Sequence, residues 1–177
     1  MLNLFDADFP CKMAECIVFT GGGTGGHVFP ALAVLEELAV RWPGRVVWIG
    51  SASGMERAIL TQRGIPYYGI PSGKLRRYFS IGNIIDLLRI LAGFLAAVFI
   101  LIKEKPRLVF SKGGYVSVPP VLAAGLLGIP ALTHESDLNP GLATRINARF
   151  CERILKSFAE TERFFGPRLA ARIVHTG

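Results

Sequence analysis

The chain has 177 residues, of which 51% are hydrophobic, so it can form one domain with a sizeable core and is not an intrinsically disordered chain. Its formal net charge of +7 predicts an anionic partner; because basic runs interleaved with aromatic residues are absent, nucleic acid is disfavoured against phosphates or an acidic membrane surface. The three cysteines form no C-x-x-C pair, which indicates a reducing compartment and argues against a disulfide framework or a zinc site.

Residues 1–15 are predicted to be an N-terminal extension, and the folded domain is expected to span residues 16–177. The extension lacks the basic segment and apolar core of a signal peptide. It contains the pattern D-x-D at Asp6 and Asp8, which some metal-dependent sugar transferases use. Because the pattern falls in a tail instead of at the end of a strand, we do not expect it to bind metal.

A glycine-rich loop follows the first predicted strand. Residues 16–20 are apolar and β-branched, which predicts a buried strand, and an amphipathic helix is expected from about Val28, with Pro30 in its first turn. Between them lie GGGTGG (residues 21–26) and His27. Glycines let the backbone approach a ligand, and the N–H groups at a helix N-terminus favour an anion. The segment therefore predicts a phosphate-binding loop with His27 as a candidate base; a tight packing turn and a structural histidine are the alternatives.

A dinucleotide-binding domain is a second interpretation of this loop, because Gly21, Gly23 and Gly26 satisfy G-x-G-x-x-G. Such a domain needs an acidic residue at the end of the second strand. The second predicted strand, residues 45–49, ends without one, and Glu56 comes too late. We therefore disfavour a nicotinamide or flavin cofactor.

A basic loop and a long apolar segment follow the next two predicted elements, a helix at 54–63 and a strand at 66–70. The loop reads KLRRYF (residues 74–79), and the apolar segment covers residues 81–102. Asp86 and Arg89 interrupt the segment, and its unbroken apolar run is too short to span a bilayer. We expect a long helix that is either a core helix or lies, with the basic loop, on an anionic membrane.

The second half of the chain repeats the strand, loop and helix order. Strands are expected at residues 107–111, 131–133, 153–157 and 172–175, and helices at 118–127, from about 142 to 150, and at 161–165. A second glycine loop, Lys112-Gly113-Gly114-Tyr115, follows the first of these strands. The polar cluster His134-Glu135-Ser136-Asp137 follows the second.

This alternation predicts an α/β fold with a doubly wound, mostly parallel, Rossmann-like sheet. Ligands of such sheets bind beyond the carboxyl ends of the strands. Both glycine loops and the polar cluster are expected at that edge. Alternatively, His134 and Glu135 form a hydrogen-bonded pair that orders the loop, and Asp137 serves only to turn it.

Three segments resemble one known family: GGTGGHVFPALAV, SKGGYVSVPPVLAA and HES-D-x-x-PG, in this order. They resemble the N-terminal domain of the MurG family, the peripheral membrane N-acetylglucosaminyltransferases of peptidoglycan synthesis. The resemblance covers residues 16–177 and implies a GT-B fold, in which two Rossmann-like domains flank the active site. It implies inverting transfer of GlcNAc from UDP-GlcNAc to the C4 hydroxyl of undecaprenyl-diphosphate-MurNAc-pentapeptide (lipid I to lipid II). It also implies no metal ion or other cofactor, and a peripheral location on the cytoplasmic face of the bacterial inner membrane.

The resemblance also implies roles for individual residues. His27 matches the histidine considered as the base on the acceptor hydroxyl, and Glu135 is the other catalytic candidate. Asp137 stands where many members carry an asparagine that touches the donor sugar, so it adds charge near a diphosphate. The remaining substrate-binding positions are Thr24, Gly25 and Gly26, which match the loop in contact with UDP-GlcNAc, and Gly113, Gly114 and Tyr115. The two glycine loops together are expected to hold the acceptor diphosphate, and Lys74, Arg76, Arg77 and Phe79 match the membrane-facing patch.

Members of the family continue through a Gly-Asn-Pro linker into a second domain, which supplies most contacts to uridine and diphosphate. This sequence stops at Gly177, where that linker would start. We therefore expect the donor-binding domain to be absent and the chain to supply the acceptor- and membrane-binding half, inactive alone. The alternative is a membrane-recruiting, non-catalytic subunit of a split glycosyltransferase.

Overall fold

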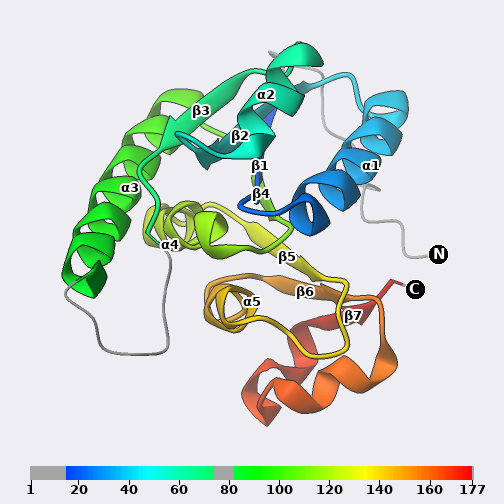
Figure 1. Cartoon of the computed structure of the whole chain (residues 1–177). Coiled ribbons are helices and arrows are strands. Elements are labelled where there is room, and N and C mark those ends of the chain that lie inside the picture. The colour runs from blue at the N-terminus through cyan, green and yellow to red at the C-terminus, as the bar shows by residue number, and fades with distance from the viewer. Residues whose placement is uncertain (1–14, 74–81, 177) are drawn as a thin grey trace.

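The computed structural model describes residues 15–73 and 82–176, and within them it confirms the α/β fold. All strands pair in parallel, in the order β3-β2-β1-β4-β5-β6-β7 (Figure 1). The strands are β1 (Cys16–Thr20), β2 (Arg45–Ser51), β3 (Tyr67–Ile70), β4 (Leu108–Ser111), β5 (Ala131–Glu135), β6 (Arg153–Lys156) and β7 (Ile173–His175). The α-helices are α1 (Gly25–Arg41), α2 (Met55–Gln62), α3 (Gly82–Glu104), α4 (Val118–Leu127) and α5 (Leu142–Asn147). The 3-10 helices are η1 (Tyr115–Ser117), η2 (Ala159–Phe164) and η3 (Pro167–Arg172).

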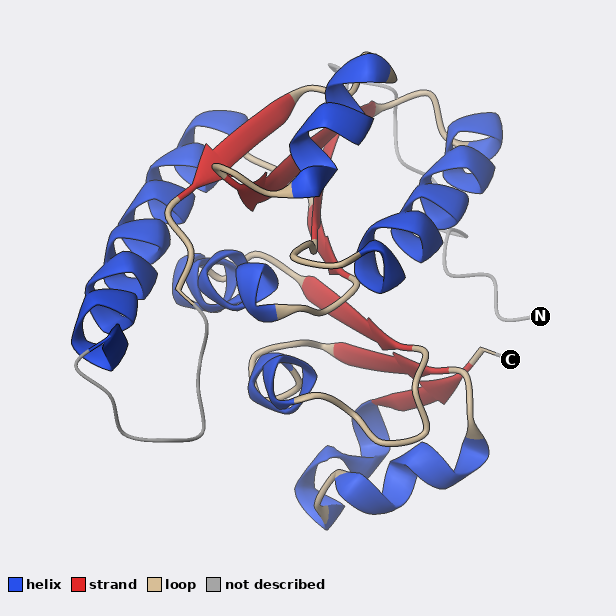
Figure 2. Ribbon diagram, in the orientation of Figure 1, coloured by secondary structure: helices blue, strands red, loops and turns tan. Residues whose placement is uncertain are grey.

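Helices cover both faces of the sheet. The helices α1 and α2 lie on one face, and α3, α4 and α5 lie on the other (Figure 2). Phe19, Trp48 and Leu60 are fully buried in the core on the α1 side, and Val18 and Leu101 are fully buried in the core on the α3 side. Successive residues of β1 thus enter opposite cores, as expected for a strand covered on both faces.

Two predicted boundaries next to the site were wrong. Helix α1 begins at Gly25 instead of near Val28, so Pro30 lies in its second turn, where its ring nitrogen cannot donate to the carbonyl of Gly26. Strand β5 runs to Glu135 instead of ending at Thr133. Glycine is a poor helix former and charged residues are uncommon in strands. Local propensity therefore did not predict the earlier start of α1 or the later end of β5.

The C-terminal elements also differ from the expected ones. Helix α5 ends at Asn147 instead of about residue 150, and the helix expected at residues 161–165 is the 3-10 helix η2. The sequence did not predict η3, which precedes β7.

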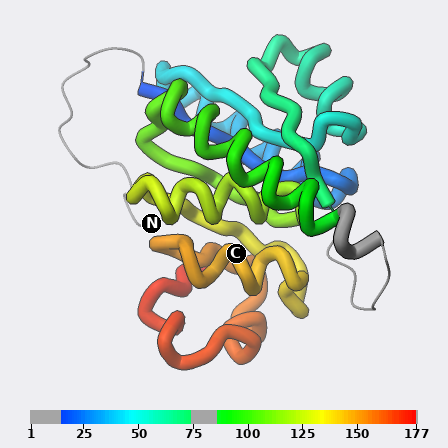
Figure 3. The backbone as a smooth tube through the Cα atoms, turned by 90° about the vertical axis from the view of Figure 1, so that its left-hand side faces the viewer, coloured from blue at the N-terminus to red at the C-terminus, as the bar shows by residue number. Residues whose placement is uncertain are grey.

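Helix α3 presents an apolar outer face. It runs beside α4 across the sheet (Figure 3). The exposed side chains recur every three or four residues, which places them on one face of a helix: Leu88, Leu91, Leu95, Phe99 and Ile102 are each at least 50% exposed. In the part of the chain that the structure describes, no helix is both long and apolar enough to cross a membrane. The predicted membrane contacts Lys74, Arg76, Arg77 and Phe79 lie outside the described residues.

Candidate functional site

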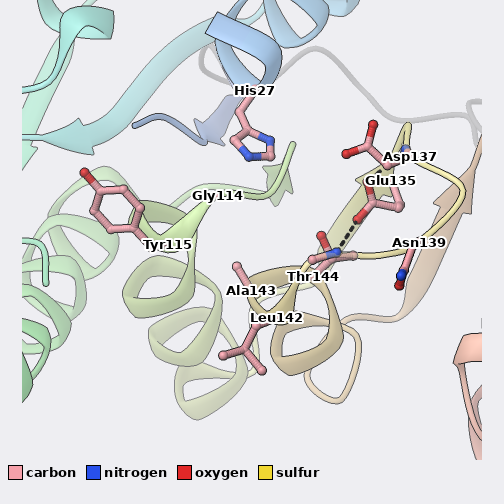
Figure 4. Close-up of a pocket in the computed structure, with 10 residues that line it drawn as sticks. His27, Gly114, Tyr115, Glu135, Asp137, Asn139, Leu142, Ala143 and Thr144 are labelled. Atoms are coloured by element: carbon pink, nitrogen blue, oxygen red, sulfur yellow. Dashed lines mark hydrogen bonds between the residues drawn. The ribbon is translucent and has the colours of Figure 1, made fainter. Parts of the chain in front are cut away.

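A pocket of about 270 Å³ lies at the carboxyl edge of the sheet. It opens where β1 and β4 are neighbours and lead into helices on opposite faces, which is the switch point where doubly wound sheets bind ligands. Five predicted site residues line it, namely His27, Gly114, Tyr115, Glu135 and Asp137 (Figure 4). The other lining residues are Asn139, Gly141, Leu142, Ala143 and Thr144. The second glycine loop, the polar cluster and His27, which directly follows the first glycine loop, thus meet in one pocket although they are distant in the sequence.

His27 is the third residue of α1. Its ring lies between Tyr115 on one side and the carboxylates of Glu135 and Asp137 on the other (Figure 4). Its Nδ1 lies 3.3 Å from the backbone carbonyl oxygen of Lys112. A carbonyl oxygen only accepts hydrogen bonds, so in the neutral ring this contact favours the tautomer with the proton on Nδ1 and the lone pair on Nε2. An imidazole held in this tautomer can accept a proton at Nε2.

The second glycine loop supports the ring of His27. Gly113 and Gly114 have φ values of +90° and +80°, which side chains of L-residues rarely adopt. A Cβ atom at Gly114 would lie 3.0 Å from His27 Cδ2 and would collide with the carbonyl oxygen of Gly22. Glycine at residue 114 therefore permits both the position of the histidine and the contact between the two loops.

Three buried, hydrogen-bonded side chains support the second glycine loop. Asn147 Nδ2 donates to the hydroxyl oxygens of Ser117 at 2.8 Å and Ser111 at 3.2 Å. The Ser117 hydroxyl donates to the carbonyl oxygen of Gly114, and Ser111 Oγ accepts from the N–H of Gly113. Sequence reasoning assigned these side chains no role, because they come from β4, η1 and α5 and no spacing indicates that they meet.

The first glycine loop ends in the N-terminus of α1. Thr24 is the exposed N-cap residue, and its side chain does not cap the helix. Gly25 and Gly26 are the first two helical residues, and the first N–H groups of a helix have no carbonyl partner within it. These groups lie at the positive end of the helix dipole, which favours an anion. Thr24, Gly25 and Gly26 are not pocket-lining residues; they belong to the same helix end as His27.

Tyr115 braces the first loop from the second. Its ring lies so close to Gly23 that a Cβ atom there would collide with it. Burial raises the pKa of its phenol, the charge of Glu56 adds to this, and a hydrogen bond with Ser72 opposes it. The hydroxyl group points away from the centre of the pocket (Figure 4). Packing against Gly23 is thus the contact through which Tyr115 shapes the site.

Glu135 orders the loop that follows β5. Its Oε1 accepts from the N–H of Asp137 at 3.0 Å and its Oε2 from the N–H of Gly141 at 3.3 Å. Both carboxylate oxygens are therefore engaged with backbone, and the partners are amides of the loop instead of His134. Asp137 is exposed at the rim of the pocket.

A buried lysine lies beside these acids. Lys112 is only 2% exposed, and its Nζ donates to Ser136 Oγ at 2.9 Å. Burial lowers the pKa of its ammonium group, although Glu135 and Asp137 act in the opposite direction. Burial, together with the charge of Lys112, lowers the pKa of His134 to about 4. His134 is consequently neutral near pH 7.

Sequence comparison places the chain among sugar transferases. Residues 17–156 match the model of the glycosyltransferase family 28 N-terminal domain. The chain is 52% identical over 171 residues to the UDP-N-acetylglucosamine–N-acetylmuramyl-(pentapeptide) pyrophosphoryl-undecaprenol N-acetylglucosamine transferase of Treponema denticola, and 54% identical over 171 residues to that of Treponema pallidum. These matches cover 92% and 97% of this chain but 44% of each relative. The chain thus spans less than half the length of these relatives.

Solved structures agree with this placement. The crystal structure of Acinetobacter baumannii MurG matches with a TM-score of 0.75 and 33% identity, over 92% of this chain and 44% of that one. The structure of Staphylococcus aureus MnaA with UDP matches with a TM-score of 0.67 over 92% of this chain and 44% of that one, but at 13% identity it shows the fold alone. The chain belongs to glycosyltransferase family 28, and its residues 17–156 correspond to the N-terminal domain of that family.

Proposed function

We propose that the chain is the acceptor-binding half of an N-acetylglucosaminyltransferase. The complete enzyme transfers GlcNAc from UDP-GlcNAc to the C4 hydroxyl of undecaprenyl-diphosphate-MurNAc-pentapeptide in cell-wall synthesis. The names of the relatives support this reaction, and their additional length accommodates a donor-binding domain. The observation that carries the proposal is the pocket at the switch point, where an imidazole in a defined tautomer adjoins the anion-binding end of α1.

His27 is the general base in this proposal. Its Nε2 takes the proton of the C4 hydroxyl while that oxygen bonds to C1 of GlcNAc. The bond from C1 to the β-phosphate oxygen breaks on the opposite side, so UDP leaves and the anomeric configuration inverts. Glu135 is less suited to this role, because both its oxygens already accept backbone N–H groups.

The remaining parts of the site bind charge and sugar. The N–H groups of Gly25 and Gly26 bind the acceptor diphosphate together with the second glycine loop, because amides at a helix N-terminus stabilise an anion. Asp137 accepts a hydrogen bond from a hydroxyl of the donor sugar. Thr24 offers an exposed hydroxyl group to UDP-GlcNAc at the same helix end.

The chain acts as a peripheral protein on the cytoplasmic face of the inner membrane. The outer face of α3 supplies apolar contacts, and the basic loop at residues 74–79 supplies positive charge that favours anionic lipid. In this proposal, membrane contact brings the chain close to its lipid-linked acceptor.

Vesicle binding tests this proposal. The purified chain is sedimented with anionic liposomes that carry or lack undecaprenyl-diphosphate-MurNAc-pentapeptide. We expect stronger binding to the loaded vesicles. Gly25→Val should remove only this gain, because the added side chain crowds the N-terminus of α1. Even a Cβ atom at residue 25 would lie only 3.2 Å from the ring of Phe29. Lys74→Glu with Arg76→Glu should weaken binding to both kinds of vesicle.

Equal binding of the wild-type chain to loaded and empty vesicles would contradict the acceptor site. Incubation of the chain with UDP-GlcNAc and acceptor tests the division of labour. We expect no GlcNAc transfer without a donor-binding domain, and turnover by this chain alone would refute that part of the proposal.

A further inference from the structure

Glu56 is a buried acid that the reaction proposed above does not use. It is the second residue of α2 and is 0% exposed. Its charge is not balanced by an ion pair with any lysine or arginine in the described ranges 15–73 and 82–176. A buried carboxylate without donors is strongly unfavourable, so its partners identify its role.

The partners of Glu56 belong to the first glycine loop and to the end of β2. Its Oε2 accepts from the N–H of Gly23 at 3.3 Å, and its Oε1 accepts from the N–H of Ser51 at 2.9 Å. A Cβ atom at either Gly22 or Gly54 would collide with the carboxylate. The first glycine loop is therefore packed against the carboxyl group of Glu56.

The contact sets the direction in which the loop donates. The N–H of Gly23 points inward to Glu56, with φ at +85°, while Tyr115 packs on the same glycine. The indole N–H of Trp48 also donates to the carbonyl oxygen of Gly21 at 3.1 Å. The loop is thus anchored at both glycines, and the next residues along the chain begin α1.

We propose that Glu56 is a positioning residue for the anion-binding end of α1. It holds Gly23 so that the N–H groups of Gly25 and Gly26 and the ring of His27 are in place before the ligand arrives. The carboxylate does not repel the bound anion strongly, because two N–H groups and the positive end of α2 balance its charge. This inference rests on the proposed function, since the ligand it serves is the acceptor diphosphate.

The variant Glu56→Gln tests the proposal with little change in volume. Glutamine keeps one acceptor oxygen, but its NH₂ group faces the second N–H, so one hydrogen bond is lost. The matched control is Glu104→Gln. Glu104 is also buried, at 8% exposure, but it accepts from Tyr68 and Arg45 at the end of α3, and these partners belong to neither glycine loop.

The measurements are made on the intact chain. Isothermal titration uses a short-lipid analogue of diphosphate-linked MurNAc-pentapeptide as the probe, and ¹H–¹⁵N spectra follow the Gly23 amide, whose hydrogen bond to a carboxylate shifts its proton downfield. We expect Glu56→Gln to weaken binding about tenfold, as the loss of roughly one hydrogen bond requires, and to move the Gly23 amide upfield. Glu104→Gln should change neither quantity.

A second route reaches the same contact if Glu56→Gln folds poorly. Gly22→Ala pushes a methyl group into the carboxylate and should weaken binding in the wild-type background. In a Glu56→Ser background the collision is gone, so the same alanine should have a smaller effect.

The outcomes separate this inference from the proposed function. If the wild-type chain binds the analogue and Glu56→Gln binds it with the same affinity, the positioning role alone is overturned. The positioning role is also overturned if the chemical shift of the Gly23 amide is the same in Glu56→Gln as in the wild type, with or without ligand. Failure of the wild-type chain to bind the analogue would instead overturn the proposed acceptor site, and the ligand part of this inference with it.

Discussion

The Nδ1 atom of His27 lies 3.3 Å from the carbonyl oxygen of Lys112, so the second glycine loop determines where the proton sits on a side chain carried by the first. The ring that the proposed reaction needs is thus oriented by a backbone carbonyl group and not by the side chain of Lys112. Two loops separated by more than 80 residues act as one site through this contact.

The tautomer of His27 is directly measurable. We expect ¹⁵N spectra of the neutral imidazole rings to show the proton on Nδ1 and the lone pair on Nε2 in His27. His175 provides an internal control of the opposite kind, because its Nε2 lies 3.0 Å from the carbonyl oxygen of Ser157 and should carry the proton. A spectrum with the proton on Nε2 of His27 would remove the support for this nitrogen as the base.

Gly114→Ala should destabilise the fold more than an alanine at another glycine with positive φ. Gly128 is the control, because its φ is +67° and a Cβ atom there meets open space. We expect Gly128→Ala to cost about 1 kcal/mol in the free energy of unfolding, from backbone conformation alone. Gly114→Ala should cost roughly 1–3 kcal/mol more, because its methyl group collides with Gly22. Urea unfolding measures both, and equal costs would show that the loops are not in close contact.

The sequence could predict the sheet because each strand is a short apolar run, and the crossover rule then brings the carboxyl ends of the strands to one edge. This rule was sufficient to place His27, Gly114 and Glu135 together from the sequence alone. The start of α1 at Gly25 could not be found in this way, although the helix itself was predicted, because tertiary contacts outweigh the low helix propensity of glycine there.

The side chains that support the loops could not be predicted either. Glu56 meets Gly23 across 33 residues, and Asn147 meets Ser111 across 36. Such contacts depend on the positions of α2 and α5 relative to the sheet, which hydrophobic periodicity does not encode. An acid in the first turn of a short helix is ordinary as a sequence signal; only its burial marks Glu56 as unusual.

Stability should depend on pH through His134. Its pKa is lowered from an ordinary value of 6.5 to about 4 by burial and by the charge of Lys112. Between these pH values, His134 is protonated in the unfolded chain but neutral in the folded chain. The free energy of unfolding should therefore fall as the pH drops from about 6.5 towards 4, by on the order of 3 kcal/mol. Above about pH 6.5, His134 is neutral in both the folded and the unfolded chain, so it adds no further pH dependence to the free energy of unfolding.

Urea unfolding at about pH 7 and about pH 5 measures this dependence. His134→Gln should reduce the difference between the two, whereas the exposed control His175→Gln should preserve it. A wild-type slope that survives in His134→Gln would assign the dependence to another group.

The outer face of α3 is expected to contact lipid. Leu91 and Phe99 are 54% and 72% exposed on it, so replacing both with serine should change the free energy of unfolding by no more than about 1 kcal/mol. If they enter a bilayer, the lost apolar burial should lower partitioning onto anionic vesicles about tenfold or more. The matched control replaces Val40 and Met55, which are 82% and 50% exposed on α1 and α2, the helices of the opposite face. Vesicle sedimentation should leave this control near the wild-type value; equal losses in the two double variants would show that α3 has no special part in membrane contact.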